Sequence, residues 1–399
     1  MAPIRILHVS DIHLAQQSEL RSAKDRVTDF LKALRTGTYI GVRNAASRYI
    51  ELASSFDMSV LQQLTEFIYK EIKNGLDAVI ITGDIGTTGD KEDLDFVQKF
   101  FNESGSSEMP YQRDDGIPVL SFVKHPTPLS FFAGNHDRFS TTYEPRLVPA
   151  KMRNFIARKI GWMTPRIFDL TRAFDTEVTL PAGNPANNFN PVGSFRVQAK
   201  GGPAIYVLTA DFSLEKIGDH NGIVGWIAQG RLYQKVLTML LNETTRFLAE
   251  GEGANPRVIW ACHFPPYKDK DISKSHKLLK DHKGQQTLMD AARGVGVNVI
   301  LTGHTHDRKI YTDGNPYPKV LCCGTSTQFE PHAYAPGNEN HVQILEIDGA
   351  YGSGPVSLSV QNYLFNPTIM DGKGGVIRGP AEGVSGWTAS GPKSGPFTI

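Results

Sequence analysis

The sequence predicts an α/β layered fold, in which buried strands alternate with amphipathic helices. Six short apolar runs rich in Val and Ile end abruptly in polar residues: Ile4–Val9, Ala78–Thr82, Ser130–Ala133, Tyr206–Thr209, Val258–Cys262 and Val297–Thr302. Continuous apolarity is typical of strands that are buried on both faces. Three segments show helical periodicity between these runs: Met58–Ile72, Leu94–Phe101 and Leu232–Leu248. Strands that alternate with helices favour a fold built of helical and sheet layers.

The composition fits an ordinary globular chain and excludes several other classes. The 399 residues include 42 Lys and Arg against 41 Asp and Glu, so a globally basic nucleic-acid binder is not indicated. Three cysteines without a CxxC pair predict neither a disulfide framework nor a thiolate zinc site, which favours a reducing compartment. The apolar runs are too short for a membrane span or a signal peptide. We therefore expect a cytoplasmic protein that has no membrane partner.

Insertions and a C-terminal arm interrupt the alternating pattern. We expect one domain over residues 1–365, with insertions near 18–55, 102–128 and 175–202. The second and third insertions are rich in residues typical of loops. Residues 366–399 contain eight Gly and four Pro, which predicts an extended arm or disorder. Such an arm is compatible with a homo-oligomer.

Polar residues follow five of the predicted strands directly, and in an open α/β sheet ligands bind beside the carboxyl ends of the strands. Imidazole, carboxylate and amide groups without thiolates indicate a nitrogen and oxygen site for Mn, Fe, Zn or Co. Seven ligands are too many for one ion, whereas two ions that share one carboxylate would use them all. The seven candidate metal ligands are Asp11, His13, Asp84, Asn135, His263, His304 and His306.

The polar residues form one block after each strand: Asp11-Ile12-His13, Gly83-Asp84, Gly134-Asn135-His136-Asp137, His263 and Gly303-His304-Thr305-His306. Each of these five blocks alone is a weak signal, because a single Asp or His after a strand is usually a turn residue or a helix cap. All five in order, each after a buried strand, are specific. Gly83, Gly134 and Gly303 precede ligands, where a sharp turn and close backbone approach favour a residue without Cβ. The remaining histidines outside these blocks are expected at the surface or in hydrogen-bonded core positions: His8, His125, His220, His276, His282, His332 and His341.

The five blocks in this order resemble the calcineurin-like metallophosphoesterase superfamily over roughly residues 4–308. The resemblance implies a four-layer αββα sandwich with a dinuclear metal site at the C-terminal ends of the strands. It also implies one role for each ligand. Asp11, His13 and His306 would hold the first metal, Asn135, His263 and His304 would hold the second, and Asp84 would bridge the two.

Two further residues take catalytic roles from the same resemblance. His136 matches the family's non-ligand histidine, which protonates the leaving oxygen or stabilises the transition state. Asp137 matches the carboxylate that orients this histidine.

The second block narrows the subfamily. It reads Gly83-Asp84-Ile85-Gly86-Thr87-Thr88-Gly89 and departs from the Gly-Asp-x-x-Asp-Arg-Gly of serine/threonine protein phosphatases. Thr87 stands where purple acid phosphatases have a tyrosine ligand. The pattern is most similar to the class III cyclic-nucleotide phosphodiesterases.

The sequence therefore favours a binuclear metal-dependent phosphodiesterase. We expect it to hydrolyse P–O bonds of a small-molecule or nucleotide phosphoester with a metal-bridging hydroxide. Two divalent or trivalent ions, Mn²⁺, Fe or Zn²⁺, would be its cofactors. A nuclease, a phosphomonoesterase or a pyrophosphatase of the same superfamily stays open. Nucleic acid is not favoured as a partner. The segment Arg21–Arg48 is the one candidate for a basic groove, and a solvated helix face explains its charges better. A non-catalytic interaction module is less favoured still, because every ligand is present.

Overall fold

The computed structural model describes nineteen parts of the chain. They are residues 3–14, 58–86, 97, 100, 129–132, 134, 136–138, 192–198, 204–212, 232–249, 257–266, 282–306, 308–311, 318–327, 340–349, 356–365, 369–370, 376–378 and 386–399. The predicted insertions at 18–55 and 102–128 lie outside the described residues.

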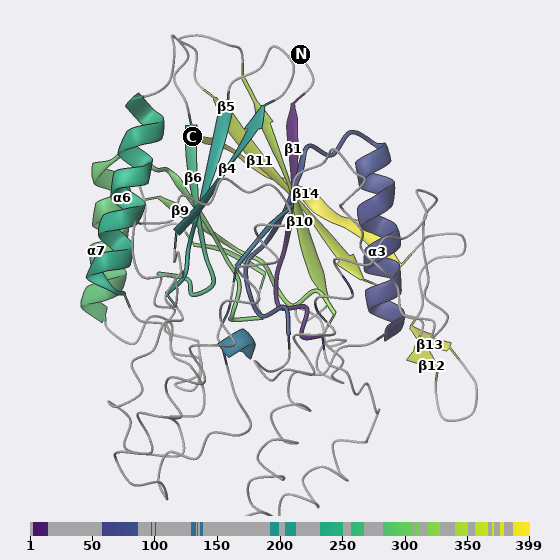
Figure 1. The fold of residues 1–399 in the computed structure, drawn as a ribbon. Coiled ribbons are helices and arrows are strands. Elements are labelled where there is room, and N and C mark those ends of the chain that lie inside the picture. The colour runs from purple at the N-terminus through teal and green to yellow at the C-terminus, as the bar shows by residue number, and fades with distance from the viewer. Residues whose placement is uncertain are drawn as a thin grey trace, which may run out of the picture.

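Two six-stranded sheets form the centre of the molecule (Figure 1). The first sheet has the order β14 (Trp387–Thr398), β11 (Ser357–Phe365), β10 (His341–Asp348), β1 (Ile4–Val9), β2 (Ala78–Ile81) and β3 (Leu129–Phe131). The second has the order β4 (Val192–Gln198), β5 (Ala204–Ala210), β6 (Arg257–Cys262), β7 (Val299–Thr302), β9 (Lys319–Cys322) and β8 (Lys309–Tyr311). A separate two-stranded sheet joins β12 (Ile369–Met370) to β13 (Val376–Arg378).

Helices cover the outer face of each sheet, so the predicted αββα sandwich is confirmed (Figure 1). One core cluster packs α3 (Met58–Lys73) against the first sheet. A second cluster packs α6 (Gln234–Ala249) and α7 (His282–Gly294) against the second sheet. A third lies between the two sheets.

Strand β1 shows why its sequence is continuously apolar. Ile4 and Ile6 belong to the core between the sheets, whereas Leu7 and Val9 belong to the core under α3. Successive side chains point to opposite faces of a strand, so a strand buried on both faces needs apolar residues at nearly every position. The same reasoning holds for β2, which is buried throughout.

The strands that precede the predicted ligands run parallel within each sheet. β1, β2 and β3 are mutually parallel neighbours, and so are β5, β6, β7 and β9. Parallel strands end at one edge, which brings the residues that follow them together.

Two segments with loop-like or arm-like composition contain strands. Residues 192–198, within the predicted loop 175–202, form β4 and pair with β5 in an antiparallel register. The loop prediction is wrong for these seven residues, where Val192 and Val197 are buried and Arg196 between them is exposed. Strand β14, within the predicted arm 366–399, pairs with β11 at the edge of the first sheet. The domain boundary at residue 366 stays a prediction.

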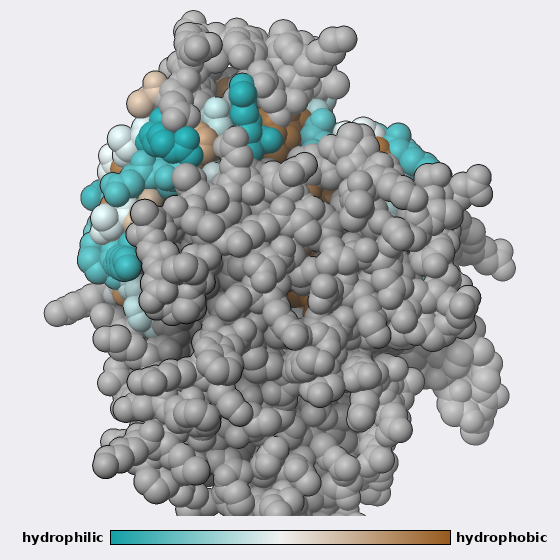
Figure 2. Space-filling view, viewed as in Figure 1, coloured by the Kyte–Doolittle hydropathy of each residue, from teal (hydrophilic) through white to brown (hydrophobic). Residues whose placement is uncertain are grey.

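The described surface is mostly polar. Among the described residues visible in Figure 2, those that reach the surface are mainly hydrophilic, and hydrophobic ones show between and behind other atoms. Among the described residues, Leu248 is the exposed large hydrophobic side chain. None of the described helices combines the length and the apolarity that a membrane crossing requires.

Candidate metal centre

Six of the seven predicted metal ligands are described, and each follows a strand at the same edge. Asp11 and His13 come after β1, and Asp84 comes after β2 in the first sheet. His263 follows β6, and His304 and His306 follow β7 in the second sheet. The site therefore spans the ends of both sheets. Asn135 lies outside the described residues, so its role stays a prediction.

The backbone is strained at the edge of the sheets where the predicted ligands lie. Among the described residues other than glycine, a positive φ occurs at Asp11, His13, Asp84, His304 and His306, with values between 50° and 70°. The left-handed region is unfavourable for side chains with a Cβ, and such strain gathers at functional sites. All five residues are predicted ligands.

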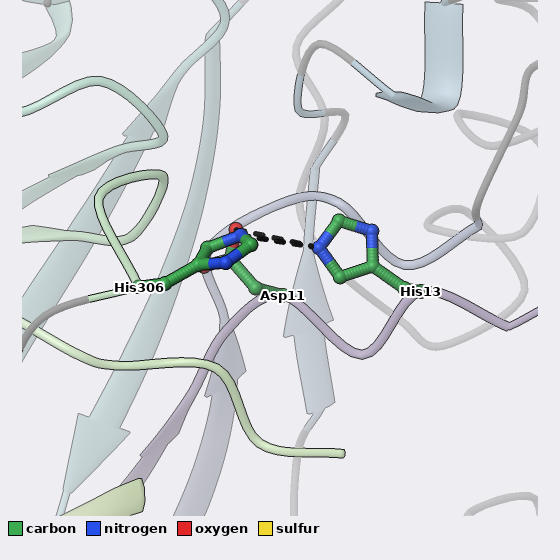
Figure 3. Close-up of side chains that lie close together, drawn as sticks. All are labelled: Asp11, His13 and His306. Carbon is green, nitrogen blue, oxygen red and sulfur yellow. Dashed lines mark hydrogen bonds and ion pairs between the residues drawn. The ribbon is translucent and has the colours of Figure 1, made fainter. Parts of the chain in front are cut away.

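The first group of ligands consists of Asp11, His13 and His306, which point toward one another in Figure 3. The Nε2 atoms of His13 and His306 are 3.3 Å apart. Asp11 Oδ1 lies 3.3 Å from His306 Nε2 and 3.9 Å from His13 Nε2. We call these three residues the first triad.

The second group consists of Asp84, His263 and His304, which we call the second triad. His263 Nε2 lies 3.1 Å from Asp84 Oδ2. The other ring nitrogen, Nδ1, donates a hydrogen bond to the carbonyl of Thr82 at 2.8 Å. In the neutral ring, this bond places the proton on Nδ1 and the lone pair on Nε2, the atom that could bind a cation. Asp84 also groups with His13, so it lies between the two triads.

The first triad has the spacing and the donor chemistry of a cation site. Ligand atoms about 2.1 Å from an ion are about 3.0–3.4 Å from one another, close to the separations found here. Asp11 Oδ1 is buried and accepts no hydrogen bond from the described residues. A buried carboxylate oxygen without a donor is costly, and a cation among the three atoms would offset that cost.

The charges of the first triad are strongly coupled. Burial disfavours the charged form of Asp11, but the interaction with His306 outweighs it and lowers the pKa to about 2. Burial and the neighbouring His136 lower the pKa of His13 to about 3, so this ring is neutral. Burial acts against the charged form of His306 as well, yet the ion pair with Asp11 raises the pKa of His306 above the usual value.

The second triad repeats this arrangement. Burial opposes the charged form of Asp84, yet the charges of His263 and His136 hold its pKa well below the usual range. Burial would also lower the pKa of His263, but Asp84 raises it to about 9. The pKa of His304 is lowered well below its usual value by burial and by His263. In each triad, one positively charged imidazole offsets the negative charge of one carboxylate. A bound cation would offset that charge instead.

His136 stands at the open side of the site, in the short 3-10 helix η1 (His136–Arg138) after β3. Its ring packs edge-on to His13 with 4.8 Å between centroids, and its backbone N–H donates to Asp84 Oδ1 at 2.8 Å. Asp11, His13, Asp84 and His263 are buried, whereas the partly exposed members of the site are His136, His304 and His306. A substrate would meet these three imidazoles first.

Asp137 is buried beside the second triad and binds backbone amides. Its Oδ1 accepts the N–H of Gly86 at 2.7 Å, and its Oδ2 accepts those of Ile85 at 3.2 Å and Gly134 at 2.8 Å. Burial and the charge of Asp84 raise the pKa of Asp137 to about 7, and the amide bonds oppose that rise. These contacts hold the backbone that follows Asp84. The predicted role of orienting His136 stays a prediction.

The three glycines of the blocks are closely packed, as predicted. A Cβ at Gly134 would lie 2.1 Å from Asp84 Oδ1, and one at Gly303 would lie 1.8 Å from Ser10 Oγ. Gly83 has a φ of 93°, and a Cβ there would lie 2.7 Å from His263 Nδ1. The backbone at these positions approaches the ligands too closely for any side chain.

The sequence interpretation missed a second set of polar residues, which lies behind the first triad. Ser10, Thr325, Ser326 and Thr327 are buried, and their contacts reach the backbone of the Asp11 loop. Their signal in the sequence is weak: a polar run, Gly324–Thr327, directly after a buried apolar strand.

Comparison with known proteins gives one family and several structures. The family described as "Calcineurin-like phosphoesterase" matches residues 4–308. A dimetal phosphatase from Danio rerio is 12% identical over 90% of this chain and 96% of that chain, with a TM-score of 0.43. GAP50, the anchor in the inner membrane complex of Plasmodium, is 11% identical over 94% and 87%, with a TM-score of 0.41. A putative 5'-nucleotidase from Staphylococcus aureus is 12% identical over 90% of this chain and 54% of that chain, with a TM-score of 0.41. A search of curated protein sequences found no match.

Proposed function

Because this chain belongs to the calcineurin-like phosphoesterase family, which makes it a metal-dependent phosphoesterase, we propose that it is a phosphodiesterase. Its substrate would be a small-molecule or nucleotide phosphodiester. The observation that carries the proposal is the pair of triads that meet at Asp84, with His136 beside them on the open side.

The family implies a dinuclear centre, and the residues present fit it. Asp11, His13 and His306 would hold one ion. His263 and His304, together with Asn135, would hold the other, and Asp84 would bridge. Two such ions, when bound, neutralise phosphoryl charge and supply hydroxide near neutral pH. Mn²⁺, Fe and Zn²⁺ all suit this donor set.

The protein's own groups would do the remaining work. His136 is partly exposed and close to Asp84, so it can donate a proton or a hydrogen bond to the departing oxygen. General acid help of this kind contributes about 10²–10⁴ in rate. Asp137 would act on His136 indirectly, because it accepts hydrogen bonds from the backbone N–H groups of Ile85, directly after Asp84, and of Gly134.

An activity panel tests the choice of substrate. Protein loaded with Mn²⁺ is assayed with bis(p-nitrophenyl) phosphate, p-nitrophenyl phosphate, cyclic nucleotides and single-stranded DNA. We expect the highest kcat/KM for a small diester. Higher kcat/KM for p-nitrophenyl phosphate would make the protein a phosphomonoesterase, and preference for DNA would make it a nuclease. Protein that binds two ions and turns over none of the four substrates would contradict the proposal.

A further inference from the structure

The loop that carries Asp11 and His13 is bonded on one side to the segment after β2. Three of its amides donate to carbonyls there. The pairs are Asp11 N–H to Gly83 at 3.1 Å, His13 N–H to Asp84 at 3.0 Å and Leu14 N–H to Ile85 at 2.7 Å. This ladder continues the parallel pairing of β1 with β2 past the end of the sheet. It accounts for the partners of these three amides, but not for the partners of the loop's carbonyls.

The carbonyls on the other side are bound by residues that follow β9. The paired register of β1 with β10 extends to His8 and no further toward the loop. Beyond that point, the Thr325 hydroxyl donates to the Asp11 carbonyl at 3.0 Å. The Thr327 hydroxyl donates to the Ile12 carbonyl, and Ser326 N–H donates to the Ser10 carbonyl at 3.1 Å. The segment therefore takes the place that β10 has alongside the strand.

These hydroxyls lie where water cannot replace them. Thr325 is 3% exposed and Thr327 is 0% exposed. A buried carbonyl that loses its donor costs the full desolvation of that group. The residues they hold are strained, because φ is 52° at Asp11 and 53° at His13. A strained backbone persists only where its surroundings over-determine it.

We propose that Thr325 and Thr327 are positioning residues for the first triad. Their hydroxyls hold the left-handed turns that aim Asp11 Oδ1 and His13 Nε2 at His306. The inference rests on the proposed role of this triad as metal ligands. It makes the affinity of the first ion depend on two side chains that lie more than 300 residues along the chain from the loop they bind.

The test is Mn²⁺ titration of metal-free protein by calorimetry. Thr325→Val and Thr327→Val remove each hydroxyl at nearly constant volume, and Thr325→Ser and Thr327→Ser keep it. We expect the valine variants to bind the first ion about 10–100-fold more weakly, as loss of an outer-shell partner does. The serine variants should regain most of this affinity. Binding of the second ion should change less, because both hydroxyls bind the loop that carries Asp11 and His13, which belong to the first triad.

Thr65→Val is the matched control. Thr65 is also buried, and its hydroxyl donates to the Leu61 carbonyl at 2.8 Å within α3, which carries no member of either triad. Its replacement should leave both affinities unchanged. Equal weakening in the control, or unchanged affinity in both Thr→Val variants, would overturn the proposal. Should Thr325→Val not fold, Thr325→Cys carries the same test with a weaker donor of similar size.

The outcome for the unmodified protein separates the two hypotheses. If it binds fewer than two ions, the proposed function is wrong and the role of the threonines falls with it. If it binds two ions and the threonine variants bind them equally well, only the positioning role is wrong.

Discussion

Two groups of histidines in this fold differ in what their ring nitrogens contact. In the metal centre, His13 and His306 face each other and the carboxylate of Asp11. In the first sheet, His8 faces neutral partners at both nitrogens, Gln343 Oε1 at 3.2 Å and Thr82 Oγ1 at 3.0 Å. The first arrangement leaves a place for a cation, and the second leaves none.

His341 belongs with His8. The backbone N–H of Gly324 donates to its Nδ1 at 3.0 Å, so the proton is on Nε2, which faces Asn362 Oδ1 at 2.9 Å. Burial lowers the pKa of His8 to about 4 and that of His341 to about 3. The prediction of hydrogen-bonded core positions is confirmed for both. The contacts of the ring nitrogens, rather than burial alone, therefore distinguish these core histidines from the candidate ligands.

The largest effect is expected from Asp84→Asn, because Asp84 belongs to the second triad and also groups with His13 of the first. The substitution removes the bridging charge with little change of shape. We expect at most one bound ion and a loss of activity of about 10³-fold or more, which corresponds to roughly 4 kcal/mol of transition-state stabilisation. Metal analysis after dialysis, together with kcat for bis(p-nitrophenyl) phosphate, measures both. Two retained ions with normal turnover would contradict the bridge.

His136→Ala tests whether every histidine of the centre is a ligand. We expect two ions to remain while kcat falls by about 10²-fold, as for a lost general acid. The loss should be large for an alkoxide leaving group and small for p-nitrophenolate, which leaves without protonation. Equal losses on both substrates would mean that His136 acts on phosphoryl charge or position. Loss of an ion would make it a ligand.

The position of the candidate metal centre could be predicted from the sequence, because its residues follow the ends of strands. The buried parallel strands are continuous apolar runs, and the polar residues directly after β1, β2, β6 and β7 are the ones that meet. Strand ends are specified by short-range pattern and converge by topology. The α/β layers and the meeting of the described candidate ligands could thus be anticipated from the pattern, whereas the αββα sandwich and the assignment of each ligand to an ion came from the family resemblance.

The rest depends on pairing that no local pattern reveals. Strand β10 interrupts its apolar run with His341 and Gln343, whose hydrogen bonds reach residues far along the chain. Helix α7 is largely polar, and its buried apolar residues are only Leu288, Met289 and Ala292, so its low apolar content gives a weak signal in the sequence. The positive φ at Asp11 and His13 is likewise invisible in sequence, because neither residue type requires it.

A matched pair of substitutions compares the two histidine groups directly. His263→Gln should lose an ion and activity, because His263 Nε2 faces Asp84. His8→Gln should keep both ions and its kcat, yet lower the free energy of unfolding by about 1–3 kcal/mol, since its buried partners lose their hydrogen bonds. Metal analysis, kcat and urea unfolding report on both variants. Loss of metal in His8→Gln would contradict the distinction between the core histidines and those of the candidate metal centre.

The last prediction concerns the neutral state of His341, which is expected to have the smallest effect on the free energy of unfolding at neutral pH. Its pKa is lowered from 6.5 to about 3 by burial, with His8 and Arg308 acting in the same direction and Asn362 opposing. Below about pH 6.5 the unfolded chain therefore binds a proton at this residue that the folded chain does not. The stability that the neutral ring contributes is complete above that pH and is lost as the pH falls toward the folded pKa.

His341→Gln removes this proton difference whatever else it does to packing. A single group contributes up to about 1.4 kcal/mol per pH unit to the slope of the free energy of unfolding. We therefore expect the variant's slope between about pH 4 and 5.5 to be smaller than the original by about that amount. Urea unfolding of metal-free protein at several pH values gives both slopes, so a general loss of stability shifts the curve without imitating the result. Parallel curves would show that His341 titrates alike in the folded and unfolded chains, and its neutral hydrogen-bonded state would then be wrong.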